Sequence, residues 1–425
     1  MIDVSRAWRS GRHLVCVAIC AALVSLASGC ADDAPLVGES SVPPVTPGAA
    51  ADAPSSVPAR SPVLGGAQAG SLKSVEPLPD ISPDISELGA SATRIIYQST
   101  GTSGEPTTVS GVVVVPSGVP PKGGWPLISF GHGTTGVENN CGPSRYSNLL
   151  GSDKLLAAFV LEGFAVTMSD YQGLGVPGFV HPYLDSKVLG YNIIDAVKAA
   201  RHFSSAIGPR WSSYGVSLGG MAAWAAADQL GGGYPAGDTQ LVGTASLVPV
   251  SDMRGLADEA WAGTLTRAQY PLLIYTLDSL AKLHPDMQLD DYRSGVARTK
   301  WSQYLECFGP DTAKLPELLA QLKPADLKPA GVDARDRLRE YLADYALPQH
   351  KASGPLLVLY GTTDDLINAD WTKQSLTRAC DLGSVVQYQR REGEGHADLD
   401  SSASVSWVKS RFLDVAPINT CGSER

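Results

Sequence analysis

The stretch WSSYGVSLGGMAAWAAADQL, residues 211–230, places a serine between two glycines directly before an alanine-rich segment. The pattern G-x-S-x-G presents a nucleophilic serine when a strand leads into it, a helix leads out of it, and an acid and a histidine follow later in the chain. Because the chain holds 44 glycines in 425 residues, the pattern alone also arises by chance. The surrounding sequence must therefore decide whether Ser217 is a nucleophile or a structural serine.

The residues around Ser217 favour the nucleophile. RWSSYGVS, residues 210–217, has the composition of a strand, and residues 218–230 have that of an apolar helix. A sharp turn from strand to helix needs small neighbours, which Gly215, Gly219 and Gly220 provide. It also brings a helix N-terminus close to the charge that develops during attack.

From about residue 92 the chain alternates between predicted strands and predicted helices. Two β-branched runs, 91–100 and 107–118, are typical of an antiparallel hairpin. Apolar runs that end in glycine then alternate with segments of helical apolar spacing as far as the C-terminus. The alternation predicts an α/β fold, a mostly parallel sheet with helices on both faces.

Residues 251–353 interrupt this alternation with helical patterns and no convincing strand. We interpret the segment as a helical cap inserted into one catalytic domain that spans residues 76–425. An insertion fits better than two sequential domains, because strands and helices alternate again after the cap.

A serine hydroxyl needs a base, and the base needs a carboxylate that holds it in one tautomer. His396, in REGEGHADLD, follows the last predicted strand on a glycine-rich loop, and we favour it over the other histidines. The buried run LLVLYG is followed by TTDD, and we favour Asp364, the first of its two acids, as the carboxylate. Asp365 is the alternative, and a third interpretation is that both acids form a solvated pair without a catalytic role. The order Ser217, Asp364, His396 is that of the α/β-hydrolase fold.

The oxyanion of an acyl-transfer intermediate needs backbone N–H donors. Leu218, directly after the serine, supplies one. The second is expected from GHGTTG, residues 131–136, with Gly133 or Thr134 as the donor, unless this segment is a simple glycine turn. No HExxH motif or Cys/His cluster of ligand spacing occurs, so we expect neither a metal nor a cofactor.

Residues 1–30 have the features of an export signal: three arginines precede an apolar run that ends in LASGC. This ending resembles the bacterial lipobox, which predicts lipidation of Cys30 and tethering to the outer face of a membrane; a plain secretory signal is the alternative. Residues 31–75 are rich in Pro, Ala, Ser and Gly, and we interpret them as a disordered stalk.

Charge and cysteines limit the partners and the compartment. The net charge of −10 argues against nucleic acid as a partner, whereas nothing in the sequence fixes the oligomeric state. Four cysteines remain after the predicted signal and lipidation site, and in an oxidising compartment they suggest two disulfides, with three possible connectivities. We favour Cys141 with Cys307 and Cys380 with Cys421; buried free thiols are the alternative.

Together the motifs HGTTGV, NNCGPS, SDYQGLG, HPYLDSKVLGYNIIDAVKAAR, GVSLGG, GTTDDLI and EGEGHAD resemble the secretory lipase family of α/β-hydrolases over roughly residues 80–420. The resemblance implies hydrolysis of carboxylic esters, including acylglycerols, beneath a helical cap. It implies an oxyanion-site role for Asp170, for which a structural loop acid is the alternative. The chain departs from the family at Leu218, where glutamine is frequent, which puts a side-chain role there in doubt.

We therefore expect an exported serine hydrolase that is lipid-anchored or secreted and acts on ester or lipid substrates. The alternatives are a short-chain carboxylesterase, a polymer esterase, a serine peptidase or an inactive binding module, because one fold serves several activities. Six apolar residues of the cap are candidates for an acyl tunnel or for cap core: Trp261, Tyr270, Leu272, Leu273, Ile274 and Tyr275.

Overall fold

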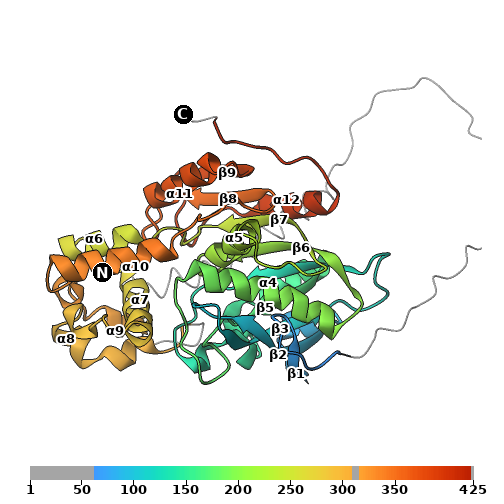
Figure 1. Ribbon diagram of the computed structural model, residues 1–425, viewed down its shortest axis with the longest axis horizontal. Coiled ribbons are helices and arrows are strands. Elements are labelled where there is room, and N and C mark those ends of the chain that lie inside the picture. Colours follow the sequence, from blue (N-terminus) through green and yellow to red (C-terminus); the bar gives the residue numbers. More distant parts are fainter. Residues whose placement is uncertain (1–61, 309–314, 423–425) are drawn as a thin grey trace, which may run out of the picture. The chain divides into compact units, whose positions relative to one another are not determined.

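The computed structural model describes residues 62–308 and 315–422, and these residues form one nine-stranded sheet flanked by helices (Figure 1). The strand order is β1-β2-β3-β5-β4-β6-β7-β8-β9. Strands β1, β2, β3 and β5 pair antiparallel in that order, and all pairs from β5 through β4 to β9 are parallel. The strands are β1 (Leu72–Pro77), β2 (Ser91–Thr100), β3 (Pro106–Val115), β4 (Trp125–Gly131), β5 (Ala165–Ser169), β6 (Ile207–Val216), β7 (Gln240–Leu247), β8 (Leu356–Gly361) and β9 (Val386–Arg391).

Helices cover both faces of the sheet, as the alternation predicts. Two buried apolar clusters lie on opposite faces, because alternate residues of a strand point to opposite sides: Val113 of β3 belongs to one cluster and Val112 to the other. Helices α4 (Ser186–Phe203), α5 (Leu218–Gly231) and α11 (Ala369–Asp381) contribute to the first cluster, and α3 (Asp153–Leu161) and α12 (Ser402–Phe412) to the second. A short helix, α2 (Pro83–Ser86), packs against α3.

Strand β1 begins inside the segment 31–75 that the sequence predicts as stalk. Leu72 is fully buried, and β1 pairs antiparallel with β2. The rest of β1 is exposed or half-buried. Because LKSVEP has one core residue and no alternation of apolar and polar residues, its composition does not indicate a strand. The first described strand therefore begins before residue 76, where the sequence places the start of the catalytic domain. The predicted signal, Cys30 and the stalk up to residue 61 lie outside the described residues.

Between β7 and β8 the described residues form helices and no strand. The longest are α7 (Gln269–Leu283) and α10 (Val332–Tyr345), and α6 (Arg254–Ala262) packs against α10. Two shorter helices, α8 (Gly295–Thr299) and α9 (Leu315–Leu319), complete the segment together with 3-10 turns. Figure 1 shows this helical layer beside the sheet. Across the described residues, no helix is long and apolar enough to span a membrane.

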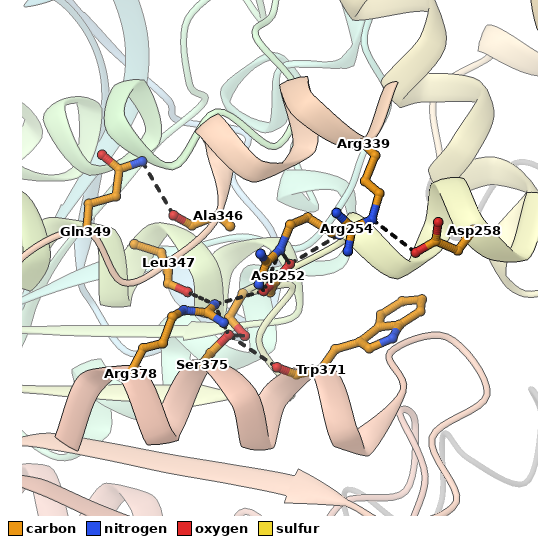
Figure 2. Close-up of polar contacts among 11 residues, drawn as sticks. Asp252, Arg254, Asp258, Arg339, Ala346, Leu347, Gln349, Trp371, Ser375 and Arg378 are labelled. Carbon is orange, nitrogen blue, oxygen red and sulfur yellow. Dashed lines mark hydrogen bonds and ion pairs between the residues drawn. The ribbon is translucent and has the colours of Figure 1, made fainter. Parts of the chain in front are cut away.

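The two ends of this helical segment are joined by one polar cluster (Figure 2). The N–H of Leu347, near the exit, donates to the carbonyl of Ser251 at the entrance over 2.7 Å. Arg378 of α11 donates to the carbonyl of Leu347 over 2.7 Å and to the carboxylate of Asp252 over 2.8 Å. Arg254 contacts the same carboxylate through Nε at 2.9 Å. The entrance and the exit of the helical segment are therefore both fixed to α11 through Asp252 and Arg378.

Both predicted disulfides are confirmed. Cys141 bonds Cys307 with a Cα–Cα distance of 5.1 Å, and Cys380 bonds Cys421 with a Cα–Cα distance of 5.5 Å. The first bond links the loop after β4 to the helical segment. The second links the end of α11 to the C-terminal tail.

Candidate active site

Ser217 occupies the turn between β6 and α5. Its φ of 61° and ψ of −123° lie in a region that residues with a side chain seldom adopt. The turn is held because the N–H of Ser217 donates to the carbonyl of Leu247 on β7 over 2.9 Å, and the N–H of Met221 donates to the carbonyl of Ser217 over 3.0 Å. Backbone strain of this kind persists where the surrounding structure enforces it, and it occurs often at active sites.

Glycines make this turn possible. A Cβ on Gly219 would lie 1.9 Å from the carbonyl oxygen of Gly131 at the end of β4, and one on Gly215 would lie 2.0 Å from the carbonyl oxygen of Gly219. Real Cβ atoms do not approach backbone oxygens this closely. The glycines named from sequence are therefore needed to pack β4, the turn and α5 together.

His396 lies on the loop after β9, and its ring joins Ser217 to Asp364. Its Nε2 atom lies 2.9 Å from Oγ of Ser217, and its Nδ1 atom lies 2.8 Å from Oδ2 of Asp364. A proton on Nδ1 donates to the carboxylate and leaves Nε2 free to accept the serine proton. The three side chains form the hydrogen-bonded chain that an activated serine requires.

Asp364 rather than Asp365 reaches the histidine. The side chain of Asp364 is 3% exposed, and its Oδ1 atom accepts the N–H groups of Leu366 and Ile367 over 2.9 and 2.8 Å. These bonds fix the carboxylate while its other oxygen faces His396. Asp365 is exposed, and its backbone carbonyl accepts the hydroxyl of Thr266 over 2.7 Å.

The candidate oxyanion donors lie on two adjoining segments. Leu218 is the first residue of α5, where an N–H has no acceptor within the helix. Gly133 and Thr134 are half-buried in the loop after β4, which contacts the turn through Gly131 and Gly219. Within residues 62–308 and 315–422, the N–H groups of Leu218, Gly133 and Thr134 donate to no acceptor. Backbone donors of this kind are available to a substrate.

Asp170 is fully buried, and its carboxylate is used within the loops. Oδ1 accepts the N–H of Ser144 over 2.8 Å, and Oδ2 accepts the hydroxyls of Ser110 and Ser144 over 2.6 and 2.5 Å. The carboxylate thus joins β3 to the turn at Ser144. These contacts fit the structural loop acid, one of the two interpretations left open, because both carboxylate oxygens accept hydrogen bonds from Ser110 or Ser144.

The five cap candidates on α7 lie in the core, which fits the second of the two interpretations left open for them. Tyr270, Leu272, Leu273, Ile274 and Tyr275 belong to the large apolar cluster and are at most 3% exposed. By contrast, Trp261 of α6 is half-buried beneath the cations of Lys328 and Arg335.

His132 lies in the candidate oxyanion loop, and no sequence motif assigns it a further role in the site. The structure buries its ring and places Nδ1 2.7 Å from the carbonyl oxygen of Gly133. The available signal was the position of His132 directly before the candidate oxyanion glycine.

The sheet order, the strained serine turn and the Ser217, Asp364, His396 order define an α/β-hydrolase fold. A model of the secretory lipase family matches residues 148–420, so the chain belongs to the secretory lipase family.

Known proteins resemble the chain over most of its length. A Mycobacterium tuberculosis protein named as a probable inactive lipase is 28% identical over 356 residues, which cover 76% of this chain and 73% of that protein. Candida antarctica lipase A in its closed state has a similar fold, with a TM-score of 0.65 at 14% identity over 84% of this chain and 85% of that one. The rice cell wall degrading esterase LipA from Xanthomonas oryzae gives a TM-score of 0.61 at 19% identity over 82% of this chain and 99% of that one.

Proposed function

We propose that this protein is an exported serine hydrolase that cleaves carboxylic esters through an acyl-enzyme on Ser217, with acylglycerols as its substrates. One observation carries the proposal: the continuous hydrogen-bonded chain from Oγ of Ser217 through both ring nitrogens of His396 to Asp364. Membership of the secretory lipase family supports ester hydrolysis as the reaction.

The mechanism follows from these contacts. Oγ of Ser217 attacks the ester carbonyl while Nε2 of His396 accepts its proton, and Asp364 stabilises the imidazolium that results. The tetrahedral intermediate collapses, and His396 returns the proton to the departing alcohol oxygen. Water, deprotonated by His396, then attacks the acyl carbonyl. As this second tetrahedral intermediate collapses, the bond from the acyl carbon to Oγ of Ser217 breaks, His396 returns the proton to Oγ, and the acid leaves.

The oxyanion formed in both steps is stabilised by backbone donors in this proposal. The N–H of Leu218 supplies one hydrogen bond and the loop at Gly133 and Thr134 supplies the other. Because a backbone N–H suffices, leucine at position 218 is compatible with the role. Losing one such donor costs about 10² to 10³ in rate in serine hydrolases.

The similar proteins suggest which substrates to compare. One is named a lipase, one a rice cell wall degrading esterase, and one a probable inactive lipase. We propose long-chain acylglycerols as the substrates. Short-chain or polymeric esters are the second candidate, because the fold also resembles that of an esterase. The hydrogen-bonded triad argues against an inactive binding module.

A panel of p-nitrophenyl esters from acetyl to palmitoyl, with emulsified triacylglycerol beside it, tests the proposal. We expect turnover by the full chain, rising on the emulsified long-chain substrate, and covalent labelling by a fluorophosphonate probe. Ser217→Ala should lose both. If that variant kept wild-type turnover, the mechanism would be wrong; if the wild type cleaved peptides and no ester, the ester assignment would be wrong.

Localisation remains part of the proposal. Lipidation of Cys30 would hold the enzyme at the outer face of a membrane. Cys30→Ser should move the protein from the membrane fraction to the soluble fraction without changing its kcat. Equal partition of the two forms would contradict the anchor and leave the hydrolase assignment untouched.

A further inference from the structure

His132 is fully buried beside the candidate oxyanion loop, and the mechanism above gives it no role. Its ring stacks on Tyr171 with the centroids 4.3 Å apart. Both ring nitrogens face backbone carbonyl oxygens: Nδ1 lies 2.7 Å from that of Gly133, and Nε2 lies 3.3 Å from that of Asp170.

A neutral imidazole can donate to only one of these two oxygens. Burial lowers the pKa of His132 below its ordinary value, so the ring is neutral near neutral pH and carries one N–H. The shorter contact assigns that proton to Nδ1. Nδ1 of His132 therefore donates to the carbonyl of Gly133.

This bond also sets the direction of the next N–H. Among the described residues the only cis peptide bond is Leu347–Pro348, so the peptide from Gly133 to Thr134 is trans. In a trans peptide the C=O and N–H bonds point in opposite directions. Because the carbonyl of Gly133 faces the buried ring, the N–H of Thr134 points away from it.

The preceding peptide is oriented differently. The carbonyl of His132 accepts the hydroxyl of Tyr171 over 3.1 Å, and its oxygen lies 2.8 Å from where a Cβ on Gly219 would be. This carbonyl faces the start of α5, so the N–H of Gly133 points away from α5. Of the two candidate loop donors, Gly133 thus has its N–H directed away from the helix that carries the Leu218 donor, which leaves Thr134 as the candidate. The hydroxyl of Thr134 lies 2.8 Å from that of Tyr183.

We propose that His132 is a positioning residue of the oxyanion hole: by donating from Nδ1 to the carbonyl of Gly133, it aims the N–H of Thr134 at the oxyanion. The inference rests on the proposed function and deepens it by choosing between Gly133 and Thr134. Because negative charge develops on that oxygen only in the transition state, loss of the contact lowers kcat and leaves KM nearly unchanged.

Replacing His132 by asparagine or by glutamine distinguishes the contributions of its two ring nitrogens. The side-chain N–H of asparagine lies close to the position of Nδ1, and that of glutamine close to Nε2. His132→Asn should keep kcat within about threefold of wild type, whereas His132→Gln should lower kcat by about 30- to 100-fold, with KM within about twofold for both. His202 is a matched control, because its Nδ1 also lies 2.9 Å from a carbonyl oxygen, that of Gly70, outside the site; His202→Gln should keep wild-type kcat.

A purely structural role for His132 would lower the urea midpoint of both variants and would not separate their kcat values. Wild-type kcat in His132→Gln would overturn the inference, and so would an equal loss in folded His132→Asn. Should neither variant fold, Tyr171→Phe keeps the ring stack and removes the hydroxyl bond to His132. Its kcat should then fall by about 3- to 10-fold, and an unchanged kcat would overturn the inference.

Failure of the proposed function has a different signature. If the wild type turned over no ester and took up no fluorophosphonate, the hydrolase assignment would fail and this inference with it. If the wild type turned over ester and Ser217→Ala did not, while His132→Asn and His132→Gln had equal kcat, the inference alone would fail.

Discussion

Asp364 and His396 are joined over 2.8 Å across the ends of two neighbouring parallel strands, β8 and β9. The second carboxylate oxygen of Asp364 is held by two backbone N–H groups of its own loop. The acid is therefore fixed by local backbone, and the histidine is oriented by the acid. In the proposed mechanism, catalysis depends on a carboxylate at position 364 rather than on acidity in the loop generally.

Asp364→Asn should reduce kcat by about 10³- to 10⁴-fold with little change in KM, because an amide can donate to Nδ1 and favour the wrong histidine tautomer. Steady-state kinetics on a soluble p-nitrophenyl ester measure the effect. Asp365→Asn, which changes the exposed neighbour, is the control and should keep wild-type kcat. The opposite ranking of these two variants would transfer the role to Asp365.

The polar cluster of Figure 2 gives a second prediction, about stability. Asp252 is 3% exposed; burial alone would raise its pKa, but its bonds to Arg254 and the nearby charge of Arg378 hold the pKa below its usual value. Asp252→Asn should lower the free energy of unfolding by about 2 to 4 kcal/mol, since two guanidinium groups lose their counter-charge. Urea denaturation measures this loss.

Asp290→Asn is the matched control for Asp252→Asn. Asp290 also pairs with two arginines, Arg293 and Arg298, but its side chain is 47% exposed. Exposed ion pairs contribute little to stability because water and salt screen them, so this variant should unfold near the wild-type midpoint. Equal losses in the two variants would show that Asp252 does not fix the ends of the helical segment.

The sequence predicts the centre of the sheet well because its strands are buried on both faces. Largely apolar runs such as LVGTASLV and PLLVLYG mark β7 and β8, and Gly361 marks the end of β8. Since the carboxyl ends of parallel strands share one edge, residues that follow β6, β8 and β9, such as Ser217, Asp364 and His396, can meet at that edge. The hydrogen bonds between them show that they do meet there.

Contacts between segments distant in sequence could not be predicted in this way. The two serines that bind Asp170 lie 60 and 26 residues before it, and no periodicity connects them to the acid. The bond from His132 to Gly133 is local, yet its meaning depends on the burial of the ring. In each case the missing information was the direction of a side chain, which residue spacing does not specify.

The disulfide between Cys380 and Cys421 should stabilise the fold without affecting catalysis. It lies near the start of β9, where the N–H of Thr420 donates to the carbonyl of Val386, whereas His396 follows the end of that strand. Replacing both cysteines by serine should lower the free energy of unfolding by about 2 to 4 kcal/mol, because the unfolded chain regains the entropy of a loop. Activity below the unfolding midpoint should equal that of wild type, and a large loss of kcat would contradict this separation.

Asp185 makes stability depend on pH with a definite sign. Its carboxylate caps α4 by accepting the N–H groups of Lys187 and Val188, yet burial raises its pKa to about 6. Between its ordinary pKa and that value the folded state holds more protons than the unfolded state, so this group lowers stability as pH rises through the window. Asp185→Asn keeps a capping oxygen without a charge, so its stability relative to wild type should increase by up to about 3 kcal/mol from about pH 4 to pH 7. Urea denaturation across that range, with exposed Asp80→Asn as the control, measures the difference; a constant or decreasing difference would refute the burial cost assigned to Asp185.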